Sequence, residues 1–161
     1  MTDLWADAAR RAGEYAATNE LVICDQLGAG YDGIVLATTA GSAVKSLRYS
    51  ELYRRERDVY IRLHNNGVEA IAGCNVPRLI DFDDNLQVVE IEIVQPPFVL
   101  DFAGATLDDP PGFPAEVLTA WEAEKREQFG DHWPRVQSVL LAFQRFGIYL
   151  ADVKPGNIQF E

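Results

Sequence analysis

Cysteine is scarce in this chain of 161 residues, and basic residues are outnumbered. Only Cys24 and Cys74 are present, each beside apolar residues, so we expect two reduced, buried thiols and no disulfide framework. The formal net charge is −11, with 25 acidic and 14 basic residues. A surface this acidic is poorly suited to binding the phosphate backbone of a nucleic acid, so we expect no nucleic-acid partner.

Long apolar runs are also missing. No segment approaches the roughly 20 residues that a membrane helix needs, and the N-terminus lacks the apolar core of a secretory signal. We therefore expect no membrane partner and a cytoplasmic location. Hydrophobic residues still make up 48% of the chain, which is enough for a globular core without disulfides or a structural metal.

The apolar period divides the chain into a strand-rich half and a helical half. Helices are expected at 3–18, from an N-cap at Ser50 to Asn65, at 114–129 and at 133–146. Strands are expected at 21–24, 34–39, 42–47, near Val76 to Asp81, and at 86–94, and the first three form an antiparallel meander. In the last strand Glu90 and Glu92 alternate with apolar residues, which predicts a half-buried strand. Pro96-Pro97 marks the boundary between the halves.

A glycine-rich segment follows the first expected strand. Gly28 to Val35 reads G-x-G-x-x-G-x-V. In a dinucleotide-binding unit such glycines lead into a helix, but a strand-like run follows here, so that interpretation fails. Two alternatives stay open. In the first, the backbone of the hairpin has no side chains at the glycines and lies over bound phosphates. In the second, the glycines are needed only for the geometry of the turn.

A lysine, Lys45, lies among apolar residues of the third strand. An unpaired buried cation is costly, so Lys45 needs a carboxylate partner. Glu56 on the next helix is the expected partner, and Glu51 in the first turn of that helix is the rival. Such a pair would turn the ammonium group toward phosphates under the glycine-rich segment. The alternative is that the Lys45 ammonium group reaches solvent and that Glu56 also faces solvent, without a pair between them.

A third group lies near the end of the chain, where Asp152, Lys154 and Asn157 form D-x-K-x-x-N. An aspartate can accept a proton from an attacking hydroxyl, and a lysine can neutralise a transferred phosphoryl group. An asparagine carbonyl can bind Mg²⁺, which prefers oxygen ligands. Alone, the segment reads as a polar turn, but three motifs in this order favour the chemical interpretation.

Together these motifs resemble the protein-kinase-like superfamily, over residues 20–161. The resemblance implies an α+β fold, with a five-stranded antiparallel sheet and one packed helix in an N-lobe (1–94). A short, partial helical C-lobe (95–161) would follow. It also implies ATP in the cleft between the lobes, with Mg²⁺.

The resemblance further implies residue roles. Asp152 would be the catalytic base, Lys154 would hold the phosphoryl group and Asn157 would bind Mg²⁺. Lys45, oriented by Glu56, would contact the α- and β-phosphates. The remaining expected ATP contacts, with Ile93 and Val94 meeting adenine through their backbone, are Leu27, Gly28, Ala29, Gly30, Gly33, Val35, Ala43, Glu92, Ile93 and Val94.

Two departures from the family pattern matter. Leu150-Ala151 stands where the family has His-Arg before the catalytic aspartate. The metal-binding Asp-Phe-Gly segment, which the family places after the catalytic loop, has no counterpart in residues 158–161. We therefore expect weak Mg²⁺ binding and impaired phosphoryl transfer, unless Asp81, Asp83 or Asp84 substitutes.

Three functions follow from these expectations. The first is a kinase that transfers the γ-phosphoryl group of ATP to a Ser/Thr or small-molecule hydroxyl. The second is a pseudokinase that acts as a nucleotide-dependent or nucleotide-free interaction module. The third is a partial kinase completed by a protein partner or by a homo-oligomer, which would cover apolar surface left exposed by the short C-lobe. The residues retained at the site favour the first function, and the missing metal aspartate favours the second.

Overall fold

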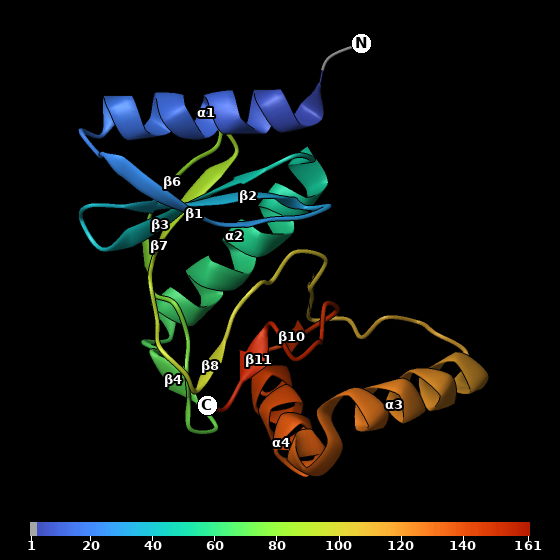
Figure 1. Cartoon of the computed structure of the whole chain (residues 1–161). Helices are drawn as coiled ribbons and strands as arrows, with labels where there is room; N and C mark the ends of the chain where they lie inside the picture. The colour runs from blue at the N-terminus through green and yellow to red at the C-terminus, as the bar shows by residue number, and fades with distance from the viewer. Residues whose placement is uncertain (1–2) are drawn as a thin grey trace.

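The computed structural model, which describes residues 3–161, has a five-stranded sheet above a smaller group of helices and short strands (Figure 1). The helices are α1 (Leu4–Thr18), α2 (Ser50–Asn65), α3 (Ala115–Phe129), the 3₁₀ turn η1 (Gly130–His132) and α4 (Trp133–Gln144). The strands of the large sheet are β1 (Ile23–Ala29), β2 (Gly33–Thr38), β3 (Ser42–Leu47), β6 (Leu79–Asp83) and β7 (Val88–Glu92). The short strands are β4 (Ala70–Ile71), β5 (Cys74–Asn75), β8 (Phe98–Val99), β9 (Thr106–Leu107), β10 (Ile148–Tyr149) and β11 (Ile158–Gln159).

The large sheet has the order β1-β2-β3-β7-β6, and every neighbouring pair is antiparallel. This confirms the α+β class, the five strands and the meander of the first three. The β2–β3 turn contains Gly41 at φ +80°, a left-handed conformation that glycine adopts without cost. The first strand runs to Ala29, so it extends into the glycine-rich segment rather than ending before it.

The large sheet is covered on both faces, by α1 on one side and α2 on the other (Figure 1). The prediction that β7 is half-buried is therefore wrong. Glu90 is only 6% exposed and accepts a hydrogen bond of 2.9 Å from the Tyr15 hydroxyl of α1. A sequence pattern that alternates acidic and apolar residues normally faces water on one side, but here α1 replaces the water.

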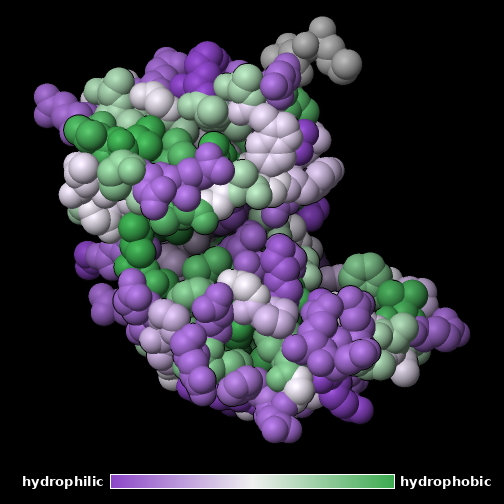
Figure 2. Space-filling model, in the orientation of Figure 1, coloured by the Kyte–Doolittle hydropathy of each residue, from purple (hydrophilic) through white to green (hydrophobic). Residues whose placement is uncertain are grey.

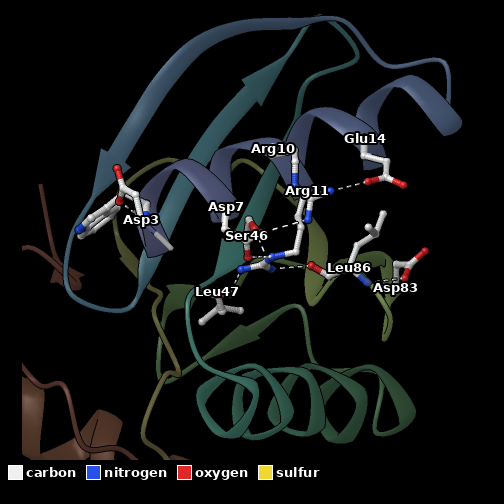
Figure 3. Close-up of polar contacts among 10 residues, drawn as sticks. Asp3, Asp7, Arg10, Arg11, Glu14, Ser46, Leu47, Asp83 and Leu86 are labelled. Carbon is white, nitrogen blue, oxygen red and sulfur yellow. Dashed lines mark hydrogen bonds and ion pairs between the residues drawn. The ribbon is translucent and has the colours of Figure 1, made fainter. Parts of the chain in front are cut away.

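Helix α1 is attached to the sheet by a buried arginine (Figure 3). Arg11 donates to the carbonyls of Leu47 at 2.7 Å and Leu86 at 2.6 Å, and to Ser46 Oγ at 3.2 Å. Its Nε donates to Asp7 Oδ2 at 2.9 Å, four residues earlier on the same helix. Because Arg11 is only 7% exposed, these bonds are largely protected from water.

Two local predictions are also wrong. Cys74 is buried as expected, but Cys24 is exposed because it lies in β1, the edge strand of the sheet. Helix α2 begins at Ser50 itself, with Tyr49 at the N-cap position and no side-chain capping bond.

The smaller group of elements, which we call the lower part, consists of β4, β5, β8 to β11, α3 and α4. Strands β11, β8, β5 and β4 form one small sheet in that order, and β9 pairs with β10. Asn75 of β5 pairs with Phe98 of β8, so strand pairing crosses the boundary expected at position 94. The hydrophobic core is also continuous across it, with the Phe102 ring between those of Tyr60 and Phe143.

Helix α3 projects from the lower part (Figure 1). Only Lys125 and Phe129 are buried along it, while Val117 and Leu118 are about half exposed, and Phe113 just before it is 57% exposed. None of the helices described over residues 3–161 has the length and apolarity to cross a membrane.

Candidate active site

A cavity of about 710 Å³ lies between the large sheet and the lower part. Figure 2 shows the molecule hollowed at this level. Every residue that the sequence analysis assigned to a site lines this cavity: Leu27, Gly28, Ala29, Gly30, Gly33, Val35, Ala43, Lys45, Glu56, Glu92, Ile93, Val94, Asp152, Lys154 and Asn157. Residues from five separate stretches of the chain are thus brought to one place, although their roles are not thereby assigned.

Lys45 is held in the wall of the cavity by two carboxylates. Its Nζ donates to Glu56 Oε1 at 2.8 Å and to Asp101 Oδ1 at 3.1 Å. The pairing with Glu56 is the one predicted, and the rival Glu51 instead pairs with Arg55 on the surface of α2. Lys45 comes from β3 and Glu56 from α2, so the packing of that helix on the sheet sets the position of the ammonium group.

Burial and charge act in opposite directions on these three groups. Burial alone would lower the pKa of Lys45, but the carboxylates of Glu56 and Asp101 raise it above its usual value. Burial raises the pKa of Glu56 to about 6, against the lowering effect of Lys45. Burial also opposes ionisation of Asp101, yet the ammonium group of Lys45 holds the pKa of Asp101 below its usual range. At neutral pH the trio therefore consists of one ammonium and two carboxylates.

The glycine-rich segment forms the β1–β2 hairpin over the cavity. Gly30 N–H donates to the Gly33 carbonyl at 3.1 Å and closes the turn. A Cβ atom on Gly33 would lie 2.0 Å from the Ser46 carbonyl oxygen, so the fold itself requires glycine there. Gly28 and Gly30 have neither a positive φ nor any atom within 4 Å of an added Cβ. Close packing against β3 therefore accounts for Gly33 but leaves the other two glycines unexplained.

The D-x-K-x-x-N segment forms a loop between β10 and β11. Asn157 is 6% exposed, and its Nδ2 donates to the backbone carbonyl of Asp152 at 2.9 Å and to Asp152 Oδ2 at 3.1 Å. Lys154 Nζ lies 3.4 Å from the same Oδ2. Asn157 thus fixes the orientation of the Asp152 carboxylate toward the cavity.

The far end of the cavity is bordered by the segment that follows β7. Ile93 and Val94 lie just beyond the strand, and within residues 3–161 neither makes a backbone–backbone hydrogen bond through its N–H or carbonyl. Glu92 also lines the cavity, while its side chain pairs with Arg78. Free backbone donors and acceptors next to an apolar wall can hydrogen-bond a flat polar ring.

Asp101 is the main residue that the sequence analysis missed. It follows β8, which pairs with β11 just after Asn157, so it lies beside the D-x-K-x-x-N loop although it precedes that loop by about fifty positions. Asp101 has φ +71°, a left-handed conformation that costs a residue other than glycine roughly 1–2 kcal/mol. The chain carries an Asp-Phe pair in Asp101-Phe102-Ala103-Gly104, but this pair precedes Asn157, whereas the family pattern places its Asp-Phe-Gly segment after the catalytic loop.

The other carboxylates considered as substitutes do not reach the site. Asp81 and Asp83 belong to β6 and Asp84 follows that strand, and none of the three lines the cavity. Asp84 instead accepts hydrogen bonds from Tyr53 and Arg57 of α2. Two other carboxylates do line the cavity, those of Asp101 and of Asp32 in the hairpin.

Comparisons with known proteins add no relatives: no family model, no curated protein and no solved structure matches this chain.

Proposed function

We propose that this protein is a kinase-like phosphotransferase that binds ATP with Mg²⁺ in the cavity. The observation that carries the proposal is the Lys45 ammonium group, fixed between Glu56 and Asp101 in a cavity that also holds Asp152 and Asn157. A buried cation held at the wall of an open cavity is suited to neutralising phosphate oxygens.

The glycine-rich hairpin supports the same proposal. Nothing in the fold demands glycine at positions 28 and 30, and the space where side chains would stand is open. Bare backbone at these positions lets a polyphosphate approach the hairpin closely. Ile93 and Val94 would bind the adenine ring through their free backbone groups.

The residues present also fit a magnesium ion. Asp101 and Asn157 would hold it with a carboxylate and a carbonyl oxygen, the ligands that Mg²⁺ prefers. A bound Mg²⁺ supplies charge neutralisation for phosphoryl transfer. Asp152 would accept the proton of the attacking hydroxyl, and Lys154 would hold the transferred group. Because Asp101 would supply a second metal-binding group beside Asn157, the proposal includes transfer and is not limited to binding.

Calorimetry with ATP tests the proposal, first with Mg²⁺ and then with EDTA. We expect binding that weakens at least about tenfold without Mg²⁺ and again in Lys45→Ala, because an ionic contact to phosphate is lost. Lys125→Ala in α3 is the matched control, and its affinity should equal that of the native chain. Circular dichroism verifies that each variant is folded. A folded Lys45→Ala variant with undiminished ATP affinity would remove Lys45 from the site.

The exposed apolar residues near α3 favour a second candidate function, an interaction module. Val117 and Leu118 on the projecting helix α3, and Phe113 just before it, are about half exposed. Contiguous exposed apolar surface usually marks a contact with another protein. Sedimentation velocity at micromolar concentration tests self-association. A larger species that disappears in Val117→Glu/Leu118→Glu would support the module, and a single monomer boundary for both chains would contradict self-association through α3.

A further inference from the structure

Three carboxylates converge on the cavity from three separate parts of the chain. Asp32 comes from the tip of the β1–β2 hairpin, Asp101 from the segment that follows β8, and Asp152 from the loop after β10. One carboxylate oxygen of each lies within 4.8 Å of the other two. Like charges this close repel one another unless a cation or a proton lies between them.

The backbone around Asp32 is held in place. Its carbonyl accepts from Arg48 N–H at 2.8 Å, and the Arg48 guanidinium donates to the Tyr31 carbonyl at 3.0 Å. On the other side, Gly33 is pressed against Ser46 so closely that no side chain fits. The hairpin tip therefore carries Asp32 into the cavity as part of the fold, and the carboxylate is positioned before any ligand binds.

The charges of the cavity do not balance. Five carboxylates line it (Asp32, Glu56, Glu92, Asp101, Asp152) against two ammonium groups (Lys45, Lys154). Of these carboxylates, Glu92 is paired with Arg78. Lys45 reaches Glu56 and Asp101, and Lys154 reaches Asp152, but within residues 3–161 no basic group lies within 4.0 Å of the Asp32 carboxylate. An excess of negative charge remains in the cavity, centred on Asp32.

A buried amide oxygen beside the carboxylates points independently to a cation. Asn157 is only 6% exposed, and both hydrogen bonds that its Nδ2 donates go to Asp152. Its Oδ1 accepts no hydrogen bond from any residue in 3–161, and Asn157 belongs to the cavity lining. A side-chain oxygen that is held in place and has no hydrogen-bond donor is a ready ligand for a hard cation.

We propose that Asp32 completes a three-carboxylate site with Asp101, Asp152 and the Asn157 oxygen, and that this site binds a divalent cation of the Mg²⁺ or Mn²⁺ type before any nucleotide. The order of binding rests on the proposed function. ATP brings roughly four negative charges into a cavity that already carries an excess, so the cation has to enter first or with it. The hairpin then becomes a ligand arm of the metal site as well as a cover for phosphates.

Mn²⁺ binding to the full chain without nucleotide tests the site, with free Mn²⁺ measured by electron paramagnetic resonance. We expect Asp32→Asn to weaken Mn²⁺ binding about tenfold or more, because one of three charged ligands is lost. Asp25→Asn, an exposed position on β1, is the matched control and should bind like the native chain. Thermal unfolding gives a second readout, since Mn²⁺ should raise the Tm of the native chain and of Asp25→Asn more than that of Asp32→Asn. Equal Mn²⁺ affinity in folded Asp32→Asn and native chains would overturn the proposal.

ATP titrations separate this inference from the proposed function. At saturating Mn²⁺ we expect Asp32→Asn to bind ATP more weakly than the native chain. If Asp32 only repels phosphate, the variant binds ATP more tightly and Mn²⁺ equally well, and the cation site is overturned. If neither chain binds ATP while Asp32→Asn still loses Mn²⁺, the cation site stands and the proposed function falls.

Discussion

Glu56 is a buried carboxyl group with one satisfied oxygen. Its Oε1 accepts from Lys45, whereas its Oε2 has no hydrogen-bond partner in residues 3–161 and is sealed from solvent. Burial therefore raises the pKa of Glu56 to about 6 from a usual value of 4.5, even though Lys45 is adjacent. The folded protein holds this proton more tightly than the unfolded chain does.

This shift predicts a dependence of stability on pH. A raised carboxyl pKa adds stability below pH 4.5, and that stability is lost as the pH rises to about 6. We expect the free energy of unfolding to fall by about 2 kcal/mol across this window. Glu56→Gln should flatten that part of the profile in urea titrations, whereas Glu51→Gln on the surface should keep it. A profile that is unchanged in Glu56→Gln would refute the shift. The carboxyl groups whose pKa is lowered, such as those of Asp84 and Asp101, change the free energy of unfolding at more acidic pH than Glu56 does.

The sequence could predict the Lys45–Glu56 pair because both residues sit in elements with clear periodicity, and a buried lysine demands a partner. Asp101 could not be found in this way. It lies in an irregular segment between two strands of two residues each, where no apolar period exists, and its place depends on pairing with β11. Asp32 was visible in the hairpin, but its closeness to Asp101 and Asp152 is a tertiary property.

At the scale of the elements, α1 is more than a surface cap. The apolar period predicted its bounds within about one residue, because Ala8, Ala12 and Tyr15 form one buried face. The period did not predict that Arg11 lies on that face too. Charged residues usually mark the solvent side of a helix, and the burial of Arg11 is favourable because the carbonyls of Leu47 and Leu86 accept hydrogen bonds from it.

Arg10 and Arg11 offer a matched pair of substitutions on this helix. Arg11→Ala should lower the free energy of unfolding by about 2–4 kcal/mol, because two buried carbonyls lose their donor. Arg10, which pairs only with exposed Asp7 and Glu14, should be replaced by Ala with almost no change. Chemical denaturation of the two variants measures both. Equal losses of stability would show that Arg11 contributes no more than a surface ion pair.

At the scale of the whole molecule, one core joins the large sheet to the lower part. Phe102 is 1% exposed, and its ring lies 5.0 Å from that of Tyr60 on α2 and 5.6 Å from that of Phe143 on α4. Because the residue next to Asp101 sits between the helices of both parts, the position of that carboxylate depends on how the parts pack together.

Replacing Phe102 should therefore affect stability strongly. We expect Phe102→Ala to lower the free energy of unfolding by about 3–5 kcal/mol, since it leaves a cavity between α2 and α4. Phe113→Ala removes the same ring from an exposed position and should change stability little. Differential scanning calorimetry gives both values. Two separate transitions in the native chain would contradict a single shared core.

The short strands have a further consequence for the order of folding. Thr106 and Leu107 pair with residues about forty positions later, and Phe98 and Val99 with residues about sixty positions later, with the α3–α4 hairpin between them. Closing loops of this length costs chain entropy, and this cost comes before the two-residue strand pairs contribute any stability. The β1–β2–β3 meander joins near neighbours and can form early, so the Lys45 side of the cavity would exist before Asp101 and Asp152 arrive opposite it. The protein would acquire its shape first and its charged centre last.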